Sequence, residues 1–315
     1  MSQSKKITDG ALLMAIYIML LIMSVFIPAF ILIGLFILPI PFIMYAARYN
    51  WKPTLLIIVL ALVLSLMFAT IVSLPLTLLT SFGGLAIGTA IYNKESSYQT
   101  WAKGTIGFII GLLLVFVSAQ LLLGINWTTE LDTIIEESLV TSESIMQQLG
   151  FTDQVEEQMT LITEQMKSLL LLIPAVITII SIVLSLITTF LSYKIINRVD
   201  KEKYYFTPFR NFNLPMSVFW IYFLVIILSF FNNDITTTMG TVIANGMVIL
   251  TSLMILQGFS LVFHYADKKR WPKAIPIIII IISFLIPFIL MLVIRFLGII
   301  DLGFGLKKRV SSQDK

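Results

Sequence analysis

Long apolar runs, separated by short polar segments, follow one another along most of the chain. Each run is close to the roughly 20 residues that an α-helix needs to cross the hydrocarbon core of a bilayer. The runs lack the period-two alternation of membrane β-barrel strands. The pattern therefore predicts an all-α, polytopic transmembrane helix bundle of about nine spans, within a range of eight to ten. The predicted spans are residues 10–26, 29–47, 53–71, 76–92, 104–123, 169–196, 214–231, 238–265 and 276–296.

One stretch, residues 124–167, interrupts this pattern because it is polar and acidic. It holds nine of the 17 acidic residues and no Lys or Arg before Lys167. Its apolar positions recur at helical spacing, so we expect two amphipathic helices that form an acidic, extracytoplasmic hairpin. The expected apolar positions are Leu131, Ile135, Leu139, Met146 and Leu149 in the first helix, and Val155, Met159, Ile162, Met166 and Leu169 in the second. The hairpin separates a five-span region at 1–123 from a region of about four spans at 168–315.

The composition agrees with a membrane protein, because 58% of the residues are hydrophobic, 12% are charged and the mean hydropathy is +0.98. A soluble domain is about a quarter charged. The chain has no cysteine and one histidine, which excludes disulfides, thiolate metal sites and a zinc-protease motif. It also lacks the glycine-rich, lysine-containing loop of many ATPases. We therefore expect neither enzymatic activity nor a cofactor or metal.

Basic residues indicate which loops face the cytoplasm. Lys and Arg gather at the N-terminus and in segments 48–52, 94–103, 194–210 and 268–273. Even numbers of predicted spans separate these clusters, so all are expected in the cytoplasm and 124–167 outside. The net charge of +4 thus reflects topology rather than nucleic-acid binding.

The basic cluster at 307–309 is an exception, because nine spans place it outside. Either the last segment is re-entrant or one earlier hairpin does not cross. The N-terminal apolar run has no clear cleavage site, and no organelle signal is visible. These features favour a multipass protein of the bacterial cytoplasmic membrane.

Four polar side chains in the predicted spans are candidates for an intramembrane polar site: Asn245, Gln257, His264 and Arg295. Ionisable groups within a membrane are costly and often functional. The competing interpretation places His264 at the cytoplasmic interface and lets the Arg295 side chain extend to the headgroups. Asp301, six residues after Arg295, is then its candidate partner.

Pairs of small residues four positions apart occur in three predicted spans. The pairs are Gly84 with Gly88, Gly107 with Gly111, and Ala11 with Ala15. Such pairs let helix backbones approach closely, and internal packing is the expected role of the glycines. The alanine pair lies at the start of the first span and by itself indicates a weaker helix contact.

The stretch TDGALLMAIY at residues 8–17, which contains Ala11 and Ala15, resembles the start of the S components of energy-coupling-factor transporters. In that family, an alanine pair at this spacing docks against a shared transmembrane coupling subunit. The proline-broken second span and the glycine-bearing fourth and fifth spans are also similar, over about residues 8–196. Across its whole length the chain more closely resembles the YybS-type proteins, uncharacterised multipass membrane proteins of bacteria.

The resemblance implies a small-molecule-binding or uptake component without its own ATPase. It also implies a membrane coupling subunit as partner and a ligand cavity between spans near the outer face. The alternative is a non-transporting membrane scaffold or regulatory partner protein that docks another protein through the acidic hairpin. The lipid bilayer is a partner in both cases. The seam at 155–169 suits pairing between copies as well as folding back within one chain, so the oligomeric state stays open.

Overall fold

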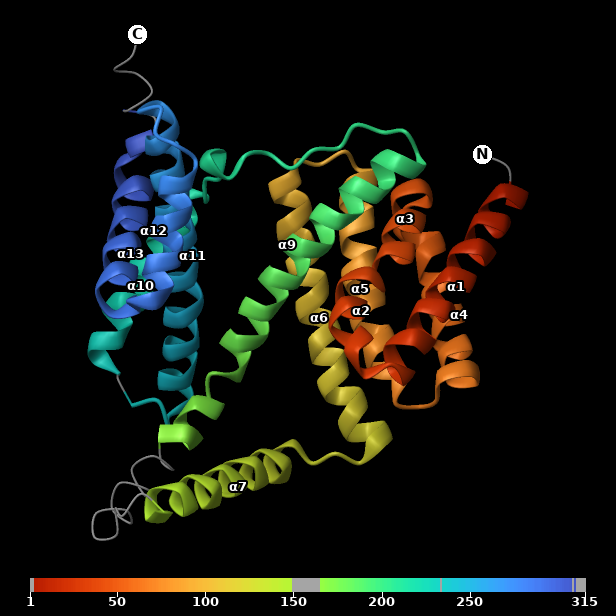
Figure 1. Ribbon diagram of the computed structural model, residues 1–315, viewed down its shortest axis with the longest axis horizontal. Helices are drawn as coiled ribbons and strands as arrows, with labels where there is room; N and C mark the ends of the chain where they lie inside the picture. Colours follow the sequence, from red (N-terminus) through yellow and green to blue (C-terminus); the bar gives the residue numbers. More distant parts are fainter. Residues whose placement is uncertain (1–2, 149–164, 233, 308, 310–315) are drawn as a thin grey trace. The chain divides into compact units, whose positions relative to one another are not determined.

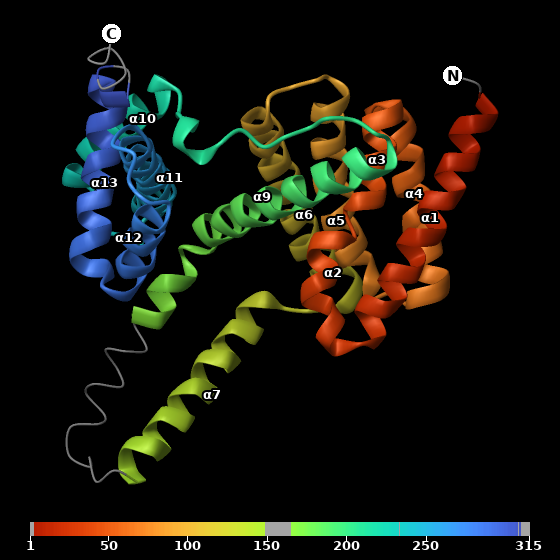
Figure 2. The same ribbon diagram turned by 45° about the horizontal axis from the view of Figure 1, so that its top comes forward.

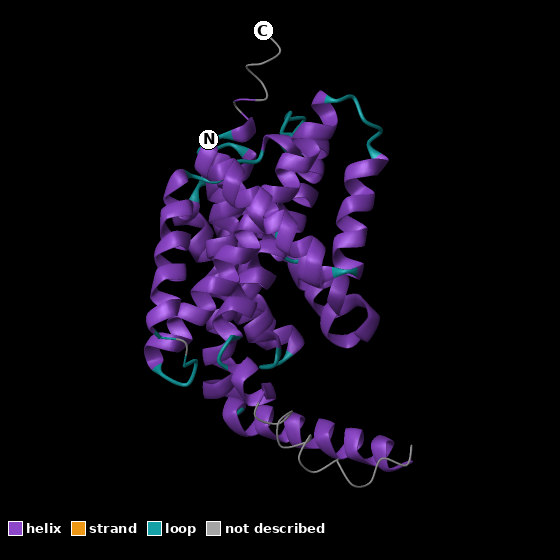
Figure 3. Cartoon of the chain, turned by 90° about the vertical axis from the view of Figure 1, so that its left-hand side faces the viewer, coloured by secondary structure: helices purple, strands orange, loops and turns teal. Residues whose placement is uncertain are grey.

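The structure is a computed structural model that describes residues 3–148, 165–232, 234–307 and 309. All regular secondary structure in these residues is helical (Figure 3). Eight helical segments in the described part of the chain are long and apolar enough to cross a membrane, and two shorter apolar helices accompany them. The predicted all-α, polytopic architecture is therefore confirmed.

The helices group into two compact units. Unit 1 comprises residues 1–166 and 180–206, and unit 2 comprises residues 167–179 and 207–315. Unit 1 contains α1 (Gln3–Phe26), η1 (Pro28–Phe30), α2 (Ile31–Ile37), α3 (Ile40–Tyr49), α4 (Trp51–Ala69), α5 (Ser73–Tyr92), α6 (Ser97–Leu123), α7 (Trp127–Gln148) and most of α9 (Ile173–Val199) (Figure 1). Unit 2 contains the start of α9, η2 (Phe209–Asn211), α10 (Met216–Phe231), α11 (Thr238–Lys268), α12 (Ala274–Leu285) and α13 (Pro287–Phe304).

The core of unit 1 forms around α5, which packs against α3, α4 and α6. Large buried side chains from α1, α3 and α6, such as Tyr17, Phe42 and Phe108, surround it. The Tyr17 ring meets the edge of Phe42 at a centroid distance of 4.7 Å, and its hydroxyl donates to Thr77 Oγ1 on α5 at 2.8 Å. The polar end of this buried tyrosine is thus satisfied inside the bundle.

Local sequence signals explain where α6 begins and ends. Ser96 and Gln99 form a capping box at its start, which satisfies backbone N–H groups that the helix leaves free. Gly124 ends the helix in the left-handed conformation, with φ of 68°. The chain then enters α7, whose Trp127 stacks on Phe116 of α6 at 4.4 Å. The end of the fifth span therefore holds the first residue of the acidic helix.

The predicted amphipathic character of the first acidic helix is visible in α7. Ile135 is buried, Leu131 and Leu139 are half-buried, and most of the remaining described positions are exposed. The second predicted helix and most of its seam, together with Leu149, lie in 149–164, outside the described residues.

In unit 2, α11 and α13 pack with almost no space between their backbones. A Cβ added to Gly258 would lie 2.0 Å from the Ile294 carbonyl oxygen, and one added to Gly298 would lie 1.9 Å from that of Met254. Only glycine permits this approach at both positions.

The predicted ninth span, residues 276–296, is two helices rather than one. It is divided at Ile286, which has φ of −124° and ψ of 68°. Ile286 precedes Pro287, and a residue before proline is disfavoured in the helical conformation. With 12 residues, α12 is about 18 Å long, which is well short of the roughly 30 Å bilayer core. Helices α12 and α13 pack side by side, so the chain turns back (Figure 2).

Candidate functional site

The alanine pair of the first span lies on the outer face of α1. Ala11 and Ala15 are exposed in unit 1, as is Leu12 between them. The opposite face of α1 carries the buried Met14 and Tyr17. A second helix could therefore reach the alanine pair without disturbing the core.

The glycine pairs lie at close contacts inside unit 1. A Cβ on Gly84 would come within 2.7 Å of the Pro39 carbonyl oxygen, and one on Gly88 within 2.6 Å of that of Ile43. These two glycines face the end of α2 and α3.

The other pair, Gly107 and Gly111 of α6, lies against α5. Added Cβ atoms would come within 2.7 Å of the Phe82 carbonyl oxygen and 2.9 Å of that of Leu79. Both glycine pairs thus allow close packing of helices within the bundle.

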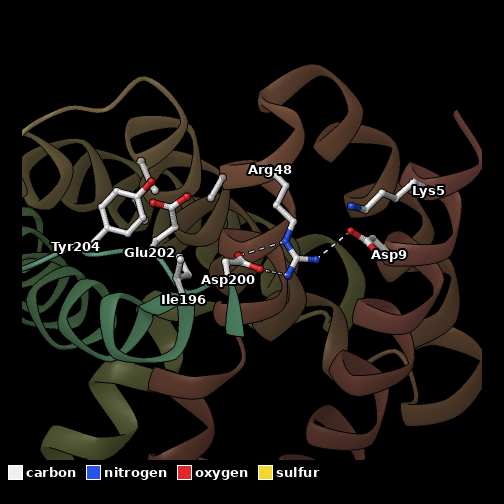
Figure 4. Close-up of a pocket in the computed structure, with 9 residues that line it drawn as sticks. Lys5, Asp9, Arg48, Ile196, Asp200, Glu202 and Tyr204 are labelled. Carbon is white, nitrogen blue, oxygen red and sulfur yellow. Dashed lines mark hydrogen bonds and ion pairs between the residues drawn. The ribbon is translucent and has the colours of Figure 1, made fainter. Parts of the chain in front are cut away.

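A charged cluster forms where α1 begins and α3 and α9 end. The Arg48 guanidinium bridges two carboxylates from distant parts of the chain (Figure 4). Its Nη1 donates to Asp9 Oδ2 at 2.9 Å, while Nη2 and Nε donate to the two oxygens of Asp200 at 2.5 and 3.3 Å. The Tyr49 hydroxyl donates to the same oxygen of Asp9 at 2.8 Å. The three charged side chains are only 19–25% exposed, so the bridge is partly shielded from solvent.

A cavity of about 450 Å³ opens beside this bridge. Lys5, Glu202 and Tyr204 line it together with the bridged residues (Figure 4). Burial raises the pKa of the Tyr204 phenol above its usual range, and the Glu202 and Asp200 carboxylates act in the same direction. The volume lies in the range of small-molecule sites, about 300–1,000 Å³. An ammonium and a carboxylate outside the bridge can both contact a polar molecule there.

This cavity lies at the opposite end of unit 1 from α7. Helix α6 begins beside Phe206, since Tyr98 contacts that ring at 5.6 Å, and it ends 27 residues later at the start of α7. At 1.5 Å per residue the two ends of α6 are about 40 Å apart. The resemblance implied a ligand cavity near the outer face, on the side of the acidic hairpin. This cavity lies at the other end of the bundle.

Asp9, Arg48 and Asp200 are not among the residues that sequence patterns single out. Asp9 is within the stretch at 8–17, and an acid directly after a basic N-terminal tail is the one available signal. The spacing along the chain does not connect Arg48 with Asp200, which is 152 residues away.

The four polar candidates of the C-terminal region do not form one site. Asn245 Oδ1 accepts from the backbone N–H of Ala175 at 2.8 Å, and its Nδ2 donates to the Leu171 carbonyl at 2.7 Å. It therefore satisfies backbone groups at the start of α9. Gln257 lies 12 residues further along α11, which is about 18 Å away.

Gln257 is fully buried at the centre of a separate polar network. Its Nε2 donates to Asp301 Oδ2 at 2.6 Å and to Asn213 Oδ1 at 2.9 Å, and its Oε1 accepts from the Leu214 N–H at 3.0 Å. All the hydrogen-bonding atoms of its amide are in use. This network stabilises the packing of α11 and α13 against the segment before α10.

Lys307 completes this network from beyond the end of α13. Its Nζ lies 3.3 Å from Asp301 Oδ2 and donates to Ser260 Oγ at 2.8 Å. Burial lowers the pKa of Lys307, and the attraction of the Asp301 carboxylate opposes this shift. Asp301 therefore pairs with Lys307 and Gln257, not with Arg295 as the sequence suggested.

The other two candidates, His264 and Arg295, lie on α11 and α13. His264 is half-buried near the end of α11, one turn from Ser260. The Arg295 guanidinium carbon lies 5.4 Å from the Phe296 ring centroid, and its Nε is buried without a hydrogen-bond partner among the described residues. Arg295 is the least satisfied charge in the described spans.

Together these features define the class of the molecule: an integral, polytopic α-helical membrane protein. The family described as "Predicted membrane protein (DUF2232)" matches residues 15–302, and the chain belongs to this family. It is 28% identical over 310 residues to "Uncharacterized protein YybS" of Bacillus subtilis (strain 168), covering 98% of this chain and 100% of that protein. The predicted YybS-like membership is therefore confirmed. No solved structure matches the chain.

Proposed function

We propose that this protein is a non-enzymatic membrane component of the S-component type, which binds or takes up a small molecule and docks a partner membrane protein. The observation that carries the proposal is the exposed position of Ala11 and Ala15 on α1. Unit 1 also contains all or most of six candidate spans. The resemblance to S components, over about residues 8–196, extends over six predicted spans as well. Energy for uptake comes from partner subunits, because the chain has no phosphate-binding loop motif.

The charged cavity beside Arg48 is the place in unit 1 where we put the small molecule. Lys5 and Glu202 offer an ammonium and a carboxylate to a polar ligand. The bridge from Asp9 to Asp200 joins the second turn of α1 to the end of α9. Docking at α1 and occupancy of the cavity would then act on the same helix.

The proposed orientation puts the basic loops in the cytoplasm and α7 outside the cell, in a bacterial cytoplasmic membrane. The turn between α12 and α13 supports it. Lys307 contacts Ser260, near the end of α11 that leads into the basic segment 268–273. Lys307 belongs to the one basic cluster that nine spans had placed outside. With this turn, the proposed orientation puts it on the cytoplasmic side with the other basic clusters.

Affinity purification in mild detergent, followed by mass spectrometry, tests docking at α1. We expect the wild type to recover a membrane coupling subunit with an ATPase, and Ala11→Leu/Ala15→Leu to lose both because leucine blocks close helix contact. The matched control is Val59→Leu/Val63→Leu, which enlarges two exposed residues at the same spacing on α4. Equal recovery by the alanine variant and the control would refute the docking face.

The alternative function is a non-transporting scaffold or regulatory protein that docks through the acidic helix. The observation that favours it is the exposure of Glu130, Glu136 and Glu137 on α7. In this case the triple Glu→Gln variant, or deletion of residues 127–163, loses the partner while Ala11→Leu/Ala15→Leu retains it. That pattern of partner recovery would refute the transport proposal and support the scaffold function.

A further inference from the structure

A second cavity lies in unit 2. It has a volume of about 370 Å³ and is lined only by apolar surface. Leu261 of α11, Ile279 of α12 and Leu297 of α13 contribute to it, together with Trp271 of the connecting loop. A dry cavity on membrane-embedded helices is suited to a hydrocarbon chain.

A basic segment, here called the basic rim, follows α11 next to the cavity-lining residues Tyr265 and Trp271. Lys268, Lys269, Arg270 and Lys273 are exposed in the segment that joins α11 to α12. The nearest acid, Asp267, forms an ion pair with Arg210, so its charge is already balanced. The positive end of the α12 dipole adds to this potential, because α12 begins directly after Lys273.

Two aromatic side chains lie between the apolar cavity and the basic rim. Tyr265 and Trp271 both line the cavity, with ring centroids 5.7 Å apart. The Lys269 ammonium lies 5.9 Å from the Tyr265 ring centroid. Tyrosine and tryptophan concentrate at headgroup level, so this order of hydrocarbon, aromatic ring and cation matches the order of groups in a phospholipid.

We propose that the cleft between α11, α12 and α13 is a binding site for one anionic phospholipid. An acyl chain occupies the apolar cavity, and the phosphate contacts Lys269 and Lys273. Basic pockets between transmembrane helices are known to hold anionic headgroups. This site is independent of the proposed function of unit 1, since its lining residues all belong to unit 2.

Fluorescence quenching by brominated lipid tests whether lipid reaches the cavity. The full-length protein is placed in phosphatidylcholine vesicles that contain equal fractions of brominated phosphatidylglycerol or brominated phosphatidylcholine. The difference between wild type and Trp271→Phe reports on Trp271. We expect the phosphatidylglycerol to quench this contribution more strongly; equal quenching by both lipids would refute a preference for anionic lipid.

Native mass spectrometry of the detergent-solubilised protein separates the headgroup from the acyl chain. Phosphatidylglycerol retention should fall about fivefold for each charge removed in Lys269→Gln/Lys273→Gln. The control Lys52→Gln/Lys94→Gln removes two exposed charges from unit 1 and should retain the lipid. Ile279→Trp, which fills the cavity without changing charge, should also lose it.

Three results would overturn the proposal. Equal retention of phosphatidylcholine and phosphatidylglycerol would show that the cleft is a lipid-facing groove without headgroup recognition. Loss in the lysine variant but not in Ile279→Trp would indicate attraction to the surface only. Loss of bound phosphatidylglycerol when inorganic phosphate alone is added would show that the basic rim binds a free anion rather than a lipid.

Discussion

At the scale of single residues, shielded charges among the described residues meet partners from other helices and loops. Arg48 bridges Asp9 and Asp200, and Asp301 is held by Gln257 and Lys307. Burying a charge is tolerable when hydrogen bonds and an opposite charge compensate for the lost hydration. These pairs therefore identify where distant segments must meet.

Removal of the Arg48 guanidinium tests the bridge in unit 1. Arg48→Met should lower stability by about 1–2 kcal/mol, because two partly shielded carboxylates lose their shared donor. The stability of Arg48→Lys should lie between those of the wild type and Arg48→Met, since an ammonium lacks the planar fork that contacts both carboxylates. The apparent unfolding temperature in one detergent measures both variants. Asp200→Asn, added to Arg48→Met, should recover part of the loss; if it recovers none, carboxylate repulsion is not the cause.

Gln257 and Arg295 should respond in opposite ways to replacement by leucine. Gln257→Leu removes one partner of Asp301 and the acceptor of the Leu214 N–H, and should cost about 2–3 kcal/mol. Arg295→Leu removes a poorly satisfied charge and should leave stability unchanged or raise it by about 1 kcal/mol. Thermal unfolding of the two variants compares them directly. Destabilisation by Arg295→Leu comparable to that of Gln257→Leu would mean that Arg295 has a stabilising partner in the membrane.

At the scale of helices, glycine positions decide which helices touch. Apolar surface alone does not select partners within lipid, because the tails are as apolar as leucine. In unit 1, Gly88 lets α5 meet the backbone of α3, whereas a Cβ added to Gly246 of α11 would make only ordinary contacts with Val225. The same residue type therefore has different roles in the two helices.

Alanine substitution should separate these two roles. Gly88→Ala puts a methyl group 2.5 Å from Ala46 Cβ and should destabilise the protein by about 1–3 kcal/mol. In Gly246→Ala the nearest atom is 3.7 Å away, on Val225, so the gain in helix propensity of about 0.5–1 kcal/mol should remain. Both shifts can be measured as unfolding temperatures. A stable Gly88→Ala protein would contradict the close packing of α3 on α5.

At the scale of the whole molecule, the turn between α12 and α13 determines the side on which the C-terminal basic cluster lies. A single span at 276–296 would carry Lys307 across the membrane. The proline-induced break instead returns the chain to the side from which α12 starts, and Lys307 contacts Ser260 there. With the proposed orientation, Lys307 then lies on the cytoplasmic side, as the positive-inside rule requires.

Single-cysteine labelling tests this topology, because the chain contains no cysteine of its own. Glu137→Cys should react with a membrane-impermeant maleimide in intact cells. Lys269→Cys and Arg309→Cys should react only after permeabilisation, since both flank the α12–α13 hairpin and the proposed orientation puts this side in the cytoplasm. Labelling of Arg309→Cys in intact cells would show that the last segment crosses the membrane.

The sequence by itself determined the class of protein, the positions of most spans, the acidic helix and the family resemblance. Each depends on residues close together in the chain: the length of an apolar run, the local density of charge, or a short motif. The tertiary structure alone joined Asp9 to Arg48 and Asp200, separated Asn245 from Gln257, and brought Gln257 to Asp301. Such contacts arise when packing brings distant segments together, and no local pattern of residues encodes that approach.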